Sequence, residues 1–113
     1  MKTNDFNKVV ENRLDLIKTT LIQKAKEYAD SENDNRLHNF DKGTLFTGKK
    51  REDVLLGFAM KHWISVTDIL DNMDKGILPT KEFLNEKLGD WTTYMVLLEV
   101  SIIDKIDKNG IKR

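Results

Sequence analysis

Apolar residues recur every three or four positions along three long stretches of the chain, which is the spacing of one face of an α-helix. The first stretch predicts a helix over residues 4–29, with an apolar stripe of Phe6, Val10, Leu14, Ile17, Leu21, Ala25 and Tyr28. The third predicts a helix over residues 81–107, with a stripe of Leu84, Leu88, Trp91, Met95, Leu98 and Ile102. Both have charged residues between the apolar ones, so each is expected to bury one face.

The second stretch, residues 51–73, is apolar on nearly every side. Its apolar residues are Val54, Leu55, Leu56, Phe58, Ala59, Met60, Trp63, Ile64, Val66, Ile69, Leu70 and Met73. Such a helix is central and covered from several directions. Two neighbouring helices cannot cover it fully, so we expect a homo-oligomer.

The connecting segments carry turn and cap residues. Residues 30–35, "DSENDN", are expected to end the first helix, and a short helix is expected over residues 35–42, before Gly43 and Gly48 break it. Gly76 suits the end of the second long helix, and Pro79 with Thr80 suits the start of the third. We therefore expect an all-α fold: one domain over residues 1–113, a bundle of three long helices and one short helix, completed by oligomerisation.

Composition excludes several classes of protein. The 113 residues include 19 basic and 19 acidic side chains, giving a formal net charge of zero, which argues against a dedicated nucleic-acid binder. There is no cysteine, so thiolate metal sites and cysteine nucleophiles are excluded. No apolar run approaches the roughly 18 residues of a membrane span, and the polar start does not look like a signal peptide. We expect a cytoplasmic protein that does not bind membranes.

Two long helices carry a polar stripe within their apolar surface. Lys61, Ser65, Asp68 and Asn72 share one side of the second helix, and Glu86, Asp90 and Thr93, with Tyr94 at the edge, share one side of the third. His62 lies on the apolar line beside the first stripe. If the stripes face each other, they enclose a pocket holding Lys61, His62, Asp68, Glu86, Asp90 and Tyr94.

Each of these features has a simpler interpretation. Glu86 and Asp90 can face solvent, as exposed carboxylates usually do. His62 can be a hydrogen-bonded core histidine, and Lys61 can extend along apolar surface into water. The segment "RLHNF", residues 36–40, can be an anchor whose Phe40 fills the end of the bundle.

The stretch "EKLGDWTTYMVLLE", residues 86–99, resembles the metal-site helix of MazG-like all-alpha nucleotide pyrophosphohydrolases, which has the form E-x-x-D. Glu86, Asp90 and Tyr94 match that helix, whereas Lys87 stands where the family has its second glutamate. The family's upstream E-x-x-E pair is represented at most by Asp68 and Asp71. The resemblance implies catalytic Glu86, Asp90 and Asp68, a Mg²⁺ ion held by Glu86 and Asp90, and a nucleotide phosphate as substrate.

The wider pattern of "KAKEYA", "RLHNF", "KHWISVTDIL" and "EKLGDWTTYMVLLE" is similar to small helical proteins of bacteriophages and prophages. This likeness implies a ligand site formed by Arg36, His38, Asn39, Lys61 and His62, in a protein of the host-cell cytoplasm. Tyr94 would stack on a base.

Three hypotheses follow. The first is a Mg²⁺-dependent nucleotide pyrophosphohydrolase. The second is a non-catalytic binder that sequesters a nucleotide-derived immune signal and uses the same cations. The third is a structural or partner-binding helical bundle, whose polar stripes would face solvent.

Overall fold

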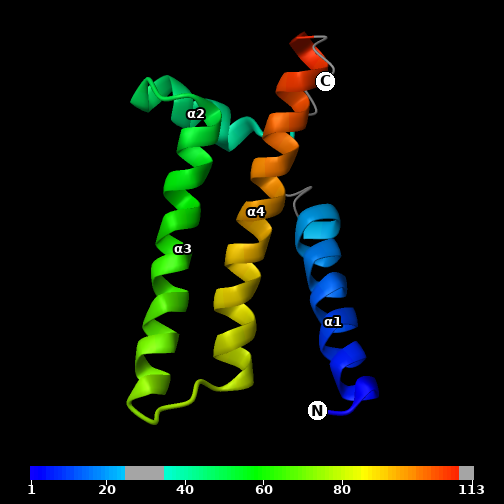
Figure 1. The fold of residues 1–113 in the computed structure, drawn as a ribbon. Coiled ribbons are helices and arrows are strands. Elements are labelled where there is room, and N and C mark those ends of the chain that lie inside the picture. Colours follow the sequence, from blue (N-terminus) through cyan, green and yellow to red (C-terminus); the bar gives the residue numbers. More distant parts are fainter. Residues whose placement is uncertain (25–34, 110–113) are drawn as a thin grey trace. The chain divides into compact units, whose positions relative to one another are not determined.

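In a computed structural model, residues 1–24 and 35–109 are described, and every regular element in these ranges is a helix (Figure 1). The all-α prediction is therefore confirmed for the described part of the chain. Contacts between Cα atoms divide the chain into two compact units, Met1–Arg36 and Leu37–Arg113. The prediction of a single domain stays a prediction.

The first unit begins with α1 (Thr3–Lys18), which continues directly into a π-helical segment, η1 (Thr19–Lys24). The predicted first helix thus changes its hydrogen-bonding pattern after Lys18, and its last expected residues, 25–29, lie outside the described ranges. Several residues of its apolar stripe are largely exposed, among them Phe6 and Leu14. The Arg36 guanidinium donates a hydrogen bond of 2.6 Å to the carbonyl of Leu21.

The second unit is built on α3 (Arg51–Asp74) and α4 (Lys81–Asn109), which run antiparallel beside each other (Figure 1). Both helices lie within two residues of their predicted bounds. On α3, the buried residues Leu55, Ala59, Val66 and Ile69 follow helical spacing and mark the covered side of the helix, and α4 is the helix that packs most extensively against α3. Trp63 and Trp91 pack together across the seam between these two helices, with ring centroids 5.0 Å apart.

The turn between α3 and α4 uses the residues that the sequence indicated. Gly76 has φ of 82°, a left-handed conformation that glycine adopts without steric cost, and its N–H bonds the carbonyl of Met73. Thr80 precedes α4, and its hydroxyl accepts a hydrogen bond of 3.1 Å from the N–H of Phe83. This is an N-cap, as predicted.

The short helix differs from its prediction. It is α2 (His38–Thr47), and Gly43 lies inside it instead of ending it. A Cβ atom on Gly43 would lie 2.8 Å from Cγ1 of Val54, so the glycine allows α2 to pack closely against α3. Gly48, with φ of 71°, ends the helix.

The core of the second unit is small. Its buried apolar side chains are Leu37, Val54, Leu55, Ala59, Val66 and Ile69. Many large apolar side chains remain exposed, including Leu45 and Phe46 at 82% and 85% and Ile64 at 54%. Completion of the bundle by oligomerisation therefore stays a prediction. Within the described ranges, no helix combines the length and apolar character that crossing a membrane requires.

Candidate functional site

An aromatic row joins α3 to α4. Phe58 and His62 lie one turn apart on α3, and the Tyr94 ring of α4 stacks on both. The Tyr94 centroid is 6.0 Å from that of Phe58, at 14° between ring planes, and 4.9 Å from that of His62, at 21°. Phe40 of α2 meets Phe58 and Tyr94 edge-on, at 6.2 and 6.3 Å. Phe40 thus fixes one end of the row, in agreement with the anchor interpretation of residues 36–40.

Asp90 places a carboxylate at the other end of the row. It precedes Tyr94 by one turn of α4, and its Oδ2 atom is 3.6 Å from Nδ1 of His62. The two side chains are 44% and 21% exposed, so the contact is open to solvent. At this distance it is an ion pair when the imidazole is protonated, and too long for a good hydrogen bond. Burial raises the pKa of Tyr94, and the Asp90 charge adds to the shift, so the phenol stays protonated at neutral pH.

The structure thus brings together His62, Asp90 and Tyr94 of the predicted pocket. Glu86 does not join them, because its side chain is 63% exposed and its nearest cation is Lys87, at 3.7 Å. Lys61 and Asp68 are also exposed. Their stripe lies off the α3–α4 seam because the neighbouring apolar line, which includes His62, forms that seam instead.

The remaining predicted ligand residues lie elsewhere. His38 and Asn39 begin α2, where Asn39 is exposed and His38 is partly buried. Arg36 belongs to the first unit, with its bond to the Leu21 carbonyl. Lys61 lines a separate hollow between the end of α2 and the first half of α3.

The three carboxylates predicted to lie at a metal site, Glu86, Asp90 and Asp68, are spread over α3 and α4. Mg²⁺ prefers several oxygen ligands in octahedral geometry. Within the described ranges, no group of three or more His, Cys, Asp or Glu side chains is placed to hold a metal ion. Glu86, Asp90 and Asp68 do not form such a group. The use of Mg²⁺ by this protein therefore stays a prediction.

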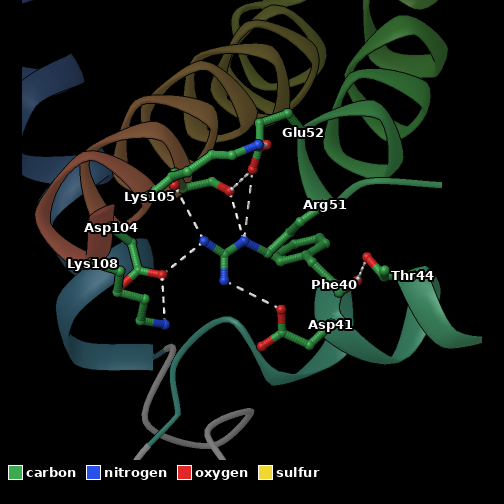
Figure 2. A network of polar contacts seen from close by, with 9 residues as sticks. Phe40, Asp41, Thr44, Arg51, Glu52, Asp104, Lys105 and Lys108 are labelled. Atoms are coloured by element: carbon green, nitrogen blue, oxygen red, sulfur yellow. Dashed lines mark hydrogen bonds and ion pairs between the residues drawn. The ribbon is translucent and has the colours of Figure 1, made fainter. Parts of the chain in front are cut away.

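A second polar cluster, centred on Arg51, was not predicted (Figure 2). Arg51 is the first residue of α3, and its guanidinium binds both neighbouring helices. Nε donates to the Ser101 hydroxyl at 2.7 Å, and Nη2 donates to the Ser101 carbonyl at 3.2 Å and to Asp104 at 2.8 Å. Nη1 donates to Asp41 of α2 at 3.2 Å. One side chain thus ties α2, α3 and α4 together.

The other members of this cluster complete its hydrogen bonding. The fully buried Ser101 hydroxyl donates to Glu52 at 2.5 Å, and Glu52 also pairs with Lys105 at 3.4 Å. Asp104 pairs with Lys108 at 3.0 Å. The Ser101 hydrogen bond lowers the pKa of Glu52, and the Arg51 hydrogen bond lowers that of Asp104. Because every charge has an opposite partner within the cluster, we interpret it as a structural clamp.

The sequence contains a weak signal for this clamp. Ser101 falls three residues after Leu98 on the predicted apolar side of α4, where a small polar residue needs a hydrogen-bonding partner. Nothing in the sequence identifies Arg51 as that partner, since 50 residues separate the two.

Comparisons with protein-family models, curated proteins and solved structures found no match to this chain. The resemblance to MazG-like pyrophosphohydrolases and to phage proteins therefore stays a prediction from the sequence.

Proposed function

We propose that this protein binds a nucleotide phosphate and sequesters it without hydrolysis. The observation that carries the proposal is the aromatic row Phe58–Tyr94–His62, with the Asp90 carboxylate at one end. A planar base can stack on an outer ring of this row, such as the half-exposed Phe58, and stacking on aromatic side chains contributes about 1–3 kcal/mol per base. A carboxylate beside the rings can accept a hydrogen bond from an amino group of the base.

The arrangement of charges favours sequestration over hydrolysis. Cleavage of a phosphoanhydride needs positive charge where the transferred phosphoryl group becomes more negative, and metal ions usually supply it. Here Asp90 pairs with His62 and Glu86 pairs with Lys87, so the two carboxylates do not point to one place where both could bind a metal ion. Binding of a nucleotide-derived signal requires no such convergence.

Calorimetric titration with AMP, ADP and ATP, with and without Mg²⁺, tests the proposal, together with an assay for released phosphate and pyrophosphate. We expect at least one nucleotide to bind and none to be cleaved. Tyr94→Leu should weaken binding about tenfold, because it removes the central ring that holds Phe58 and His62 in the row. Asp90→Asn should bind about as well as the wild type, because the amide oxygen of asparagine can still accept a hydrogen bond from an amino group of the base. Asp107→Asn, at the exposed end of α4, is the matched control.

Two results would decide against sequestration. If all three nucleotides fail to bind at millimolar concentration, the protein is not a nucleotide binder of this kind. If the wild type releases phosphate or pyrophosphate and Asp90→Asn does not, the hydrolase hypothesis replaces the proposal.

A second candidate function is self-assembly or partner binding through apolar helix surface. Two observations on α3 support it. Lys61 and Asp68 of its polar stripe are exposed. Four of its large apolar side chains are each about half exposed: Leu56, Met60, Ile64 and Leu70. Leu56, Met60 and Ile64 follow one another at intervals of one helical turn, so they share one side of α3, and an exposed apolar surface is typical of a site that another protein covers. Light scattering coupled to size exclusion should then give a multiple of the 13.1 kDa chain mass. A mass of one chain at micromolar concentration would refute self-assembly.

A further inference from the structure

A hollow between α2 and α3 is lined by lysines, a glycine and an aromatic side chain. It has a volume of about 360 Å³ and is lined by Thr47, Lys49, Asp53, Val54, Gly57, Phe58 and Lys61. This volume lies at the lower end of the range of small-molecule sites, which is roughly 300–1,000 Å³. We call it the α2–α3 groove.

Gly57 is the most informative residue of the groove. It lies inside the 24-residue helix α3, where glycine is less favourable than alanine. Gly43 is explained by its contact with Val54, but a Cβ atom on Gly57 would meet nothing within 4 Å. No packing contact in the described chain therefore requires this glycine. A glycine in such a place allows another molecule to approach the helix backbone closely.

The groove is also lined by two lysines whose ammonium groups form no ion pair with any described residue. Among the described residues, neither the Lys49 nor the Lys61 ammonium group has a carboxylate within salt-bridge distance. Lys49 is held in place at its backbone, because its N–H donates to the Thr47 hydroxyl at 3.2 Å, and that hydroxyl donates to the Gly43 carbonyl at 2.7 Å. Asp53, Gly57 and Lys61 follow one another at intervals of one turn, so Gly57 separates the carboxylate from the ammonium group.

Phe58 connects the groove to the aromatic row. Its side chain lines the groove, is half exposed and stacks on Tyr94. A ligand in the groove can therefore contact an aromatic face and two ammonium groups at once. With Asp53 included, the lining carries a net charge of +1, which suits a phosphate of one or two negative charges better than a triphosphate.

We infer that the α2–α3 groove binds a mononucleotide, whose phosphate is held by Lys49 and Lys61 and whose base packs on Phe58 over the surface left open by Gly57. This inference rests on the proposed nucleotide binding. It adds a place for the phosphate, which the His62–Asp90 pair does not supply.

Gly57→Ala distinguishes a role of Gly57 in ligand binding from a role in folding, because the substitution should raise stability and weaken AMP binding. Alanine is the better helix former, so the melting temperature should rise by about 4 °C. The added methyl group should nevertheless weaken AMP binding about tenfold. Lys49→Gln and Lys61→Gln should each weaken AMP about fivefold, whereas Lys75→Gln, an exposed lysine just after α3, should leave it within twofold of wild type.

The probes are AMP, inorganic phosphate and adenosine, titrated by calorimetry into the full chain, with oligomeric mass measured for each variant. We expect AMP to bind more tightly than either of its halves and more tightly than ATP. If AMP binds and Tyr94→Leu weakens it while the three groove variants do not, the inference is wrong and the proposed function stands. If none of the probes and no nucleotide binds, the proposed function fails as well.

One further outcome would overturn the inference. If Gly57→Ala raises the melting temperature, leaves AMP binding unchanged and lowers the oligomeric mass, the groove is filled by a second copy of the chain and not by a nucleotide.

Discussion

Replacing Arg51 by methionine would remove the guanidinium that ties three helices together while keeping an unbranched side chain in place of the arginine's aliphatic part. The substitution eliminates four hydrogen bonds: two to Ser101 and one each to Asp41 and Asp104. Glu52 keeps its hydrogen bond from the Ser101 hydroxyl and its pairing with Lys105. The clamp therefore loses its centre but not all of its members.

The size of the effect follows from the exposure of each partner. The carboxylates of Asp41 and Asp104 are 43% and 32% exposed and can return to water, so each is expected to contribute at most about 1 kcal/mol. The bond to the buried Ser101 hydroxyl contributes more, because hydrogen bonds to charged groups are worth about 1.5–3 kcal/mol. The second bond, to the Ser101 carbonyl, adds little to this. We therefore expect Arg51→Met to lower the free energy of unfolding by about 2–3 kcal/mol.

Urea unfolding followed by far-UV circular dichroism measures this loss as a shift of the midpoint at unchanged slope. Protein concentration must be the same for all variants, since self-association would add to the apparent stability. Lys108→Met is the matched control: Lys108 is 73% exposed and contacts the same Asp104, so its loss should cost about 0.5 kcal/mol or less. Equal effects of the two substitutions would show that burial of the Arg51 contacts does not contribute as argued.

Three further predictions concern acid stability, helix packing and capping. Glu52 and Asp104 have pKa values below their ordinary values of 4.5 and 3.8, so they stabilise the fold above those values, and this stabilisation is lost as the pH falls through the lower pKa values of the folded state. The urea midpoint should therefore decline below about pH 4.5. A midpoint that stays constant down to about pH 3 would contradict this. Gly43→Ala should destabilise the fold by about 1 kcal/mol, because overpacking against Val54 outweighs the gain in helix propensity. In a double-mutant cycle, Val54→Ala should cost less stability in the Gly43→Ala protein than in the wild type, and additive effects would refute the contact. Thr80→Ala should cost about 1 kcal/mol in urea unfolding through loss of the α4 cap, with Thr80→Ser close to wild type; equal losses for both would mean that the hydroxyl is not the cause.

Helical periodicity in the sequence determined most of the secondary structure. The bounds of α3 and α4 were predicted within two residues, because both helices are long and their apolar spacing is regular. The turn between them was also predicted, since a left-handed conformation requires glycine and a threonine hydroxyl caps the next helix. The short helix was misplaced because Gly43 was interpreted as a local breaker, when the contact that explains it is 11 residues away.

The candidate site was predictable only in part. Periodicity already placed His62 on the apolar line of its helix, and the structure sets it against Asp90 and Tyr94. Matching polar stripes indicated that Lys61 and Glu86 would join them, but burial of the apolar line directed the stripe of Lys61 to solvent. A polar stripe can be satisfied by water, whereas an apolar line gains free energy only when another surface covers it.

Tertiary structure alone decided which polar groups meet. The Arg51 clamp joins residues up to 53 positions apart, and no local pattern in the sequence encodes such a pairing. The α2–α3 groove arises in the same way, because Lys49, Gly57 and Phe58 become neighbours of one hollow only after α2 has packed against α3. Local spacing determines where a helix begins and ends and which side it buries, while the angle and register of packing determine which side chains come within a hydrogen bond of each other.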